Sequence, residues 1–327
     1  MIVCHSSFGA VAGSWNSVFA ETADASIFDS HLWQQIWWRH FGRGARLRIL
    51  EFNNGALRGI APLMQVGETV SFLGGNDLVD YHDFLLSHRN RRDFYRAVVG
   101  YLGADIGISR IELLSIPSSS PTIEILPEIA RSQSWTVDVK TEDIAPRLNL
   151  PDSWDVYLTL LNKKHRHELR RKLRRLENAG EAIPGELSET TDIVACLSTF
   201  FSLMRRSSPE KAVFLTPERE AFFQSLIIEL SQEGLVKLGY LDIDGQRVAA
   251  SIYFVNRGVK FLYNSGYDPD FANLSVGLLN HAYNIRRSIA QGFSNFDFMR
   301  GGESYKYHLG ASDVTLHKII MIRNSVE

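Results

Sequence analysis

The residues best suited to bind a ligand form the loop Leu274–Leu278, which leads from a strand-like run into a helical pattern. Ser275 can accept a hydrogen bond from the first turn of that helix. The amides of Val276, Gly277 and Leu278 would precede the first helical hydrogen bond, where they can bind phosphate oxygens, and Gly277 would let a ligand approach the backbone. The alternative is that Ser275 is simply a helix cap.

A second candidate is the polar pair Tyr305 and Lys306, which follows an apolar strand pattern and a Gly-Gly turn beside Arg300. Lys306 is predicted to reach into a cleft and neutralise negative charge on a bound ligand or on an oxyanion that forms during a reaction. The alternative is a solvated loop lysine. Asp297, inside the preceding apolar run, needs a positively charged partner, and either Arg300 or Lys306 could serve; a structural role is expected for it.

The run Asp80-Tyr81-His82-Asp83 could supply a proton acceptor. Asp80 is the first candidate for a general base, His82 is its rival because its ordinary pKa lies near neutrality, and Tyr81 would contact the substrate. The structural alternative is that Asp80 caps a turn and Tyr81 packs in the core. A transfer reaction can also proceed by positioning alone, without a dedicated base.

A strongly basic stretch, residues 163–175, contains a single acid, Glu168. Leu169, Leu173 and Leu176 recur at the spacing of a buried helical stripe. The charges fall on two faces, with Arg166, Arg170 and Arg174 on one and Lys164, Arg171 and Arg175 on the other. So many like charges repel one another, which favours an anionic partner such as a phosphate, nucleotide or tRNA over a purely solvated helix.

The composition is that of an ordinary globular protein: 327 residues, 45% hydrophobic and 22% charged, with a net charge of −2. This balance implies no general attraction to nucleic acid or membrane. The two cysteines, Cys4 and Cys196, form neither a metal motif nor a disulfide framework, and we expect no bound metal. No membrane span or secretory signal is expected, and the predicted location is the cytoplasm.

The second half predicts an ordered series of helices and strands. A helix from Trp154 is expected to run into the basic stretch and to end by Gly180. The remaining elements are expected at 182–188 (strand), 191–206 and 218–233 (helices), 235–242, 247–255 and 259–266 (strands), 276–291 (helix), 294–299 (strand) and 314–322 (strand). Asp244-Gly245 is typical of a hairpin turn.

The first half has a similar but weaker order. Residues 1–28 show little pattern and are expected to be loosely ordered, and Asp29 is expected to cap a helix that ends near Phe41. The elements after it are expected at 47–52, 57–65 and 69–73 (strands), 91–102 (helix), 110–114 (strand), 121–132 (helix), and 135–140 and 146–150 (strands). We therefore predict two domains, residues 1–150 and 151–327, of which the first looks like a degenerate copy of the second.

Several of these runs together resemble the CelD-like acetyltransferases associated with cellulose biosynthesis, a branch of the GNAT superfamily, and more distantly the Fem-type peptidoglycan bridge aminoacyltransferases. The matching runs are Ile60–Leu63, Phe72–Gly74 with Asp80-Tyr81, Arg166–Leu176 with Gly180, Gly245–Ser251, Phe261–Pro269, Leu274–Gly277, Phe296–Gly301 and Tyr305-Lys306. Where these families have a proline before the loop glycine, this chain has Val276, which keeps an amide donor.

The resemblance implies an α+β fold of two tandem GNAT-like domains, each a mixed, mostly antiparallel sheet flanked by helices. It implies acetyl-CoA or another acyl-CoA as co-substrate, bound by Tyr263 and Ser265 together with the residues 275–278. Tyr305, Lys306 and Asp80 would be the catalytic residues, because Fem-type enzymes are similar in having a lysine and an aspartate there. Tyr81, Arg166, Arg170, Arg174 and Arg300 would contact the acceptor or an anion.

Three functions remain open on the sequence. The first is an acyltransferase acting on an amine or hydroxyl acceptor, small or saccharide-like, in polysaccharide or cell-envelope metabolism. The second is a Fem-like transfer of an amino acid from aminoacyl-tRNA, which the basic stretch supports. The third is a nucleic-acid-binding or scaffold protein that kept the fold without the chemistry, against which stands the near-neutral net charge.

Overall fold

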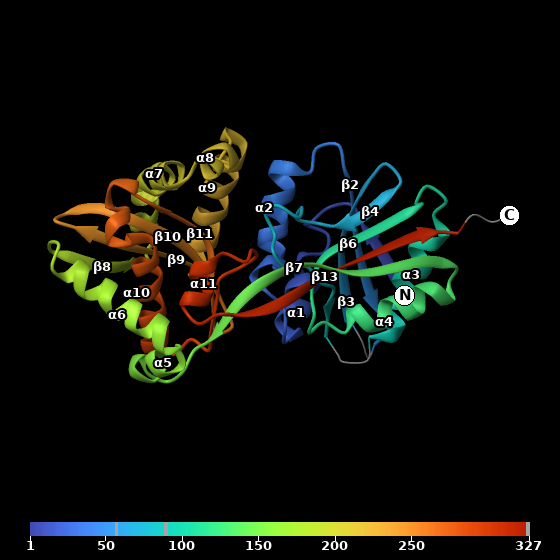
Figure 1. Ribbon diagram of the computed structural model, residues 1–327. Helices are drawn as coiled ribbons and strands as arrows, with labels where there is room; N and C mark the ends of the chain where they lie inside the picture. The colour runs from blue at the N-terminus through green and yellow to red at the C-terminus, as the bar shows by residue number, and fades with distance from the viewer. Residues whose placement is uncertain (56–57, 88–90, 325–327) are drawn as a thin grey trace. The chain divides into compact units, whose positions relative to one another are not determined.

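A computed structural model describes residues 1–55, 58–87 and 91–324, and its contacts divide the chain into two compact units (Figure 1). Unit 1 comprises Met1–Ile144 and Val314–Glu327, and unit 2 comprises Ala145–Asp313. The sequence-based division at residue 150 placed the last strand in the second domain. The observed grouping differs, because it assigns that strand to unit 1. The contacts group that strand with the first unit because it pairs there with a strand of the first half.

Unit 1 contains a sheet with helices packed against it. Its elements in chain order are β1 (Ile2–His5), α1 (Ala12–Glu21), η1 (Ile27–Asp29), α2 (His31–Phe41), β2 (Arg46–Asn53), β3 (Arg58–Val66), β4 (Thr69–Phe72), β5 (Leu85–Leu86), α3 (Arg92–Ala104), β6 (Arg110–Pro117), α4 (Thr122–Ser132), the first residues of β7 (Trp135–Asn149), and β13 (Ser312–Arg323) from Val314 onward.

The start of the chain is ordered, so the expectation of a loose segment over residues 1–28 is wrong. The helix α1 buries Trp15 completely, and the Trp15 indole nitrogen donates to the Asp29 carbonyl at 2.9 Å. Asp29 does not cap α2: the Ser30 side chain accepts from the Trp33 amide at 3.2 Å, whereas Asp29 closes a capping box with Ser26. A short helix with few apolar residues left too weak a periodic signal in the sequence to be recognised.

Unit 2 contains the elements that the sequence predicted most clearly. They are the last residues of β7, then α5 (Trp154–Leu160), α6 (Lys163–Glu177), β8 (Ala182–Leu187), α7 (Thr190–Ser207), α8 (Pro209–Phe214), α9 (Pro217–Gln232), β9 (Val236–Ile243), β10 (Gln246–Asn256), β11 (Val259–Tyr267), η2 (Pro269–Leu274), α10 (Val276–Ala290), β12 (Asn295–Asp297) and α11 (Ser304–His308).

The two sheets repeat one strand order. In unit 1 the neighbours run β1-β2-β3-β4-β6-β13, and in unit 2 they run β8-β9-β10-β11-β12-β7. Each sheet is antiparallel except for one parallel pair, β4 with β6 and β11 with β12, and in each a helix (α3 or α10) lies in the chain between the two parallel strands. The predicted α+β class, with mixed and mostly antiparallel sheets flanked by helices, is confirmed.

In unit 2 the helices cover both faces of the sheet (Figure 1). Two neighbouring residues of β10 contact helices on opposite faces. The Tyr253 hydroxyl lies within hydrogen-bond distance of His281 of α10. Phe254 packs on Tyr263, whose ring contacts Phe223 of α9. The hairpin turn predicted at Asp244-Gly245 is confirmed by the pairing of β9 with β10 and by positive φ angles at both residues.

The basic stretch begins a helix of its own. The sequence predicted one continuous helix from Trp154, but the helix is interrupted at Leu161 and Asn162. The Asn162 side chain caps the second helix by accepting a hydrogen bond from the His165 amide at 2.8 Å. An asparagine favours such a cap because its short side chain competes for backbone hydrogen bonds. The short helices α8 and α11 were also missed. Among the described residues, no helix is long and apolar enough to cross a membrane.

Candidate functional site

A cavity of about 360 Å³ lies in unit 2 where β11 ends and α10 begins. It is bounded by residues of β10, β11, α8, α10 and the segment of α11. Its lining residues are Lys211, Ser251, Ser265, Gly266, Tyr267, Ala272, Ser275, Val276, Gly277, Leu278, His281, Glu303 and Tyr305. The structure thus brings together five of the six predicted cofactor-binding residues and Tyr305.

The start of α10 presents backbone amides to this cavity. The first helical hydrogen bond runs from the Leu279 amide to the Ser275 carbonyl at 3.0 Å, so the three amides before it precede the ladder. Ser275 has the left-handed φ of 60° and its side chain caps no amide, contrary to the prediction. Its hydroxyl instead accepts from the Lys172 ammonium of α6 at 2.7 Å. A cation therefore lies beside the positive end of the helix, where both favour an anion.

Glycines bring backbone close together around the cavity. A Cβ at Gly277 would lie 3.1 Å from the Tyr267 ring, and a Cβ at Gly266 would lie 2.2 Å from the Met204 amide of α7. Gly266 therefore lets α7 pack directly on β11. Ser265 lines the cavity, but Tyr263 is not among its lining residues: its ring packs on Phe254 and Phe223. Tyr263 takes part in the packing beneath α9.

His281 and Tyr305 form a buried stacked pair on the cavity wall. Their ring centroids lie 5.4 Å apart with planes at 22°, and His281 Nδ1 lies 3.2 Å from the Tyr253 hydroxyl. Burial, with the positive charges of Lys211 and Lys306, lowers the pKa of His281 to about 3, so its imidazole is neutral near pH 7. Burial also raises the pKa of Tyr305, which keeps its phenol protonated. Sequence reasoning missed His281, which lies on an otherwise ordinary helix face.

Lys306 is neither directed into the cavity nor solvated. Its side chain is 1% exposed, and its ammonium donates to the carbonyls of Met299, Arg300 and Gly301 at 2.9, 2.8 and 2.8 Å. It also pairs with Glu303 at 2.8 Å. This geometry corrects the prediction of a cleft lysine: Lys306 holds the loop between β12 and α11 in shape, and the loop in turn places Glu303 and Tyr305 at the cavity.

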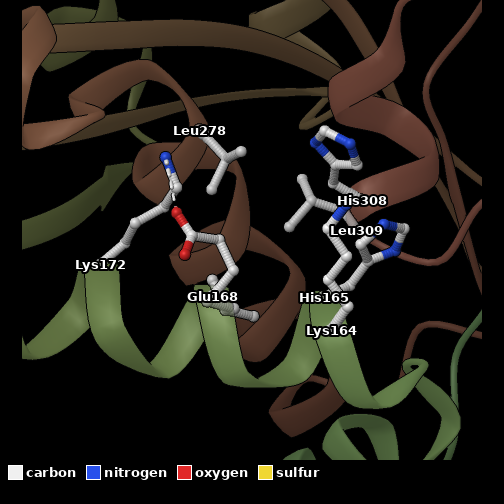
Figure 2. Close-up of a pocket in the computed structure, with 8 residues that line it drawn as sticks. Lys164, His165, Glu168, Lys172, Leu278, His308 and Leu309 are labelled. Carbon is white, nitrogen blue, oxygen red and sulfur yellow. Dashed lines mark ion pairs between the residues drawn. The ribbon is translucent and has the colours of Figure 1, made fainter.

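A second cavity, of about 250 Å³, lies between α6, α10 and α11 (Figure 2). Leu169, Leu278 and Leu309 give it an apolar lining. Lys164, His165, Glu168, Lys172 and His308 complete it. The two cavities share Leu278, and Lys172 touches both the second cavity and Ser275.

The second cavity shows which face of the basic helix turns inward. Lys164, Glu168 and Lys172 face the cavity, and the Lys172 ammonium lies 3.8 Å from Glu168 (Figure 2). The predicted anion-binding residues Arg170 and Arg174 are exposed, and Arg166 is half-buried; none of the three lines either cavity. The predicted anion-binding face of α6 therefore lies outside both cavities, and its binding of an anion stays a prediction.

The remaining predicted residues lie elsewhere. Asp80 and Tyr81 belong to unit 1, and Tyr81 is buried in its core, where its ring centroid lies 6.1 Å from that of Phe28. His82 is stacked on Phe72. Asp297 is buried and paired, as expected for a structural role: the Arg147 Nε donates to its carboxylate at 2.9 Å. Arg300 contributes its carbonyl to Lys306 and is not among the residues of either cavity.

The sequence of unit 2 matches a known domain model. Residues 163–307 match the model described as "Acetyltransferase (GNAT) domain". This range includes α6 and every residue that lines the cavity at the start of α10. It also includes the residues that line the second cavity, apart from His308 and Leu309. This part of the chain is therefore similar to GNAT acetyltransferase domains, and its fold is the GNAT fold. The narrower resemblance to CelD-like enzymes is not established by this match.

Solved structures share the fold over nearly the whole chain. A conserved protein of unknown function from Bacteroides thetaiotaomicron VPI-5482 has a TM-score of 0.65 at 11% identity, over 99% of this chain and 100% of that one. FemX has a TM-score of 0.67 at 10% identity, over 97% and 96%. L-PGS from Bacillus licheniformis has a TM-score of 0.53 at 11% identity, over 88% and 87%. A search of curated proteins returned no match.

Proposed function

We propose that this protein transfers an acyl group from a coenzyme A thioester to an amine or hydroxyl acceptor, with both reacting groups meeting in the cavity at the start of α10. The observation that carries the proposal is the cavity at the start of α10, where the residues 275–278 present backbone amides beside the Lys172 ammonium. Amides ahead of a helix and an adjacent cation suit a diphosphate. The match of residues 163–307 to the GNAT domain supports the same reaction class.

The second cavity suits another part of the same carrier. It adjoins the first at Leu278, combines a leucine lining with Lys164 and Lys172, and so fits a ligand that is partly apolar and partly anionic. We propose that the nucleotide end of the carrier binds there. The exposed residues Arg170 and Arg174 would then remain available for an anionic acceptor, as the sequence suggested.

Positioning and hydrogen bonding would carry the chemistry. The acceptor nitrogen or oxygen attacks the thioester carbonyl, the new C–N or C–O bond forms, the C–S bond breaks, and the acceptor proton leaves to solvent or to the thiolate. Tyr305 lines the cavity with its phenol protonated, so it can donate a hydrogen bond to sulfur as negative charge develops there. Asp80 stays a proposed base, and the envelope or polysaccharide role and a cytoplasmic location stay proposals from the resemblance.

Calorimetric titration with acetyl-CoA tests the proposal. We expect saturable binding, and we expect Tyr305→Phe to keep the donor affinity while lowering turnover about tenfold, a loss of about 1.4 kcal/mol in the transition state. The phenylalanine ring keeps the stack on His281 and removes only the hydroxyl. If neither acetyl-CoA nor a longer acyl-CoA binds, the proposed donor is wrong.

A second function, the use of aminoacyl-tRNA as the donor, is favoured by one observation. Four arginines of α6 are exposed: Arg170, Arg171, Arg174 and Arg175. Such a surface can contact phosphates along a nucleic acid. Binding of tRNA with a steep salt dependence, in the absence of any binding of CoA thioesters, would favour this reading, or a binding protein without catalysis, over the first.

A further inference from the structure

The cavity at the start of α10 is lined by a lysine that the chemistry proposed above does not use. Lys211 of α8 reaches the cavity wall, and its ammonium donates to the Ser265 carbonyl at 2.5 Å and lies 3.4 Å from the Ser265 hydroxyl. The sequence did not indicate a functional role for Lys211, because α8 is short and Lys211 belongs to no recognisable motif. Its position on the cavity wall, rather than its sequence context, draws attention to it.

The two charged residues on this wall differ in how their charges are balanced. Glu303 pairs with the Lys306 ammonium at 2.8 Å. Within residues 1–55, 58–87 and 91–324, the hydrogen bonds of the Lys211 ammonium go to the main chain and hydroxyl of Ser265, and no carboxylate lies within ion-pair distance of it. Lys211 is half-buried, and an ammonium that is partly removed from water without a paired anion is destabilised. Burial lowers the pKa of Lys211 accordingly, although the charge of Glu303 opposes this.

An anionic ligand group would balance this charge. Ser251 and Ser265 line the same cavity and offer hydroxyl donors to such a group. Glu303 on the same wall disfavours a doubly charged group such as a phosphate and leaves a singly charged carboxylate as the better complement to Lys211. The phosphates of the proposed donor already have their own place at the start of α10.

We propose that Lys211 binds a carboxylate carried by one of the two substrates, either at the far end of the transferred acyl group or on the acceptor. This inference rests on the proposed acyl transfer and narrows its substrates to a dicarboxylic acyl group or an amino-acid-like acceptor. Lys211 is then a residue that determines specificity. The two sources of the carboxylate can be separated by measuring each substrate by itself.

The first experiment compares two donors that differ only in the acyl carboxylate. Dissociation constants for acetyl-CoA and succinyl-CoA are measured by calorimetry with the wild-type protein and with Lys211→Gln, which can still donate to the Ser265 carbonyl but carries no charge. If the acyl group carries the carboxylate, succinyl-CoA binds the wild type at least tenfold more tightly than acetyl-CoA, and the glutamine variant loses this preference.

The second experiment examines the acceptor side. With the protein saturated with CoA, amino acids are compared with the amines that lack their carboxyl group, for example lysine with cadaverine, by thermal shift and calorimetry. If the acceptor carries the carboxylate, the amino acids bind at least tenfold more tightly than their decarboxylated partners, and the preference again disappears in Lys211→Gln.

Two further variants make the result specific to the charge at residue 211. Lys211→Arg keeps a positive charge and is expected to keep most of the preference. Lys140→Met removes an exposed lysine of unit 1, whose side chain is 63% exposed, and is expected to change nothing. If Lys211→Gln fails to fold, Lys211→Met provides the same loss of charge with an apolar side chain of similar length.

The outcomes separate this inference from the function beneath it. If the wild type binds CoA but neither pair of ligands shows a preference that depends on Lys211, the carboxylate assignment is overturned and the acyltransferase proposal stands. If the wild type binds no CoA compound, the proposed function itself fails. A preference that persists unchanged in Lys211→Gln would also overturn the assignment, because another group must then bind the carboxylate.

Discussion

Units 1 and 2 arrange their strands in the same order yet use the same place in the fold differently. In unit 2 the helix between the parallel strands, α10, begins at a cavity. In unit 1 the corresponding helix is α3, and the rings of Phe84, Phe94 and Tyr95 pack against one another around its first turn, with centroids 5.4 to 5.7 Å apart. A Cβ at Gly59 of β3 would meet the Phe94 ring at 2.6 Å.

The polar side chains near these two helices also differ between the units. In unit 1 the half-buried Asp83 accepts hydrogen bonds from the hydroxyls of Ser120 and Thr122, and the Tyr95 hydroxyl also lies 2.7 Å from that of Thr122. These groups satisfy one another. In unit 2 the polar side chains of Ser251, Lys211 and His281 line the cavity instead. The difference shows that the same topology can form either a packed core or a cavity at the start of this helix. Large aromatic rings there fill the space, whereas small and polar side chains leave it open.

The largest expected effect is on the stability of unit 1. Phe94→Ala should lower the free energy of unfolding by about 3–5 kcal/mol, because Phe94 is fully buried between rings that cannot close the space. Denaturant unfolding measures this, with Phe94→Leu as the milder control. The affinity for acetyl-CoA should stay within threefold of the wild type. A large loss of affinity in a still-folded Phe94→Ala protein would contradict the division into a packing unit and a binding unit.

The next effect is on donor binding in unit 2. Gly277→Glu should weaken the binding of acetyl-CoA at least a hundredfold, about 2.7 kcal/mol, because it places a bulky anion where the diphosphate is proposed to bind. Gly277→Ala is the matched control: its Cβ needs only a small movement of the Tyr267 ring, 3.1 Å away. We expect the alanine variant to keep most of the affinity. Equal losses in both variants would point to a packing role for Gly277.

His281 makes the stability of unit 2 sensitive to acid. Its pKa is about 3 in the folded protein and 6.5 as an ordinary histidine, so between these values the unfolded chain binds more protons and stability falls as the pH falls. The loss is about 1.4 kcal/mol for each pH unit below about 6.5. His281→Asn, which can still reach the Tyr253 hydroxyl but does not titrate, should lose less stability between pH 7 and pH 5. Denaturant unfolding at both pH values measures the difference; an unchanged slope would show that the imidazole is not held neutral.

The sequence predicted the parts of the fold that repeat along the chain. The strands of unit 2, the turn at Asp244-Gly245 and the loop before α10 follow from apolar periodicity and from glycine positions, which are local properties. The short helices α8 and α11 gave no such signal, and they carry Lys211, Tyr305 and Lys306. The sequence singled out the pair Tyr305-Lys306 by resemblance but not by any pattern of its own.

The roles of individual side chains were harder to predict because they depend on what surrounds them. Lys306 was expected in a cleft, yet three carbonyls of one loop surround its ammonium, and such a turn cannot be read from residue types. The sequence could not single out the basic residues that line a cavity on α6, for a related reason. Several faces of that helix carry lysine or arginine, so only the contacts with Leu278 and Ser275 distinguish the inner one.

The smallest expected effect concerns that inner face. Lys172→Met should weaken the binding of acetyl-CoA about fivefold, about 1 kcal/mol, because Lys172 is 20% exposed and its attraction for phosphate is partly screened by solvent. Lys163→Met, at an exposed position of the same helix, is the control and should have no effect. Calorimetry at two salt concentrations provides the measurement, and the affinity of Lys172→Met should depend less on salt than that of the wild type. If both variants lose affinity equally, α6 acts through its overall charge, and the contact between Lys172 and Ser275 has no particular part in binding the donor.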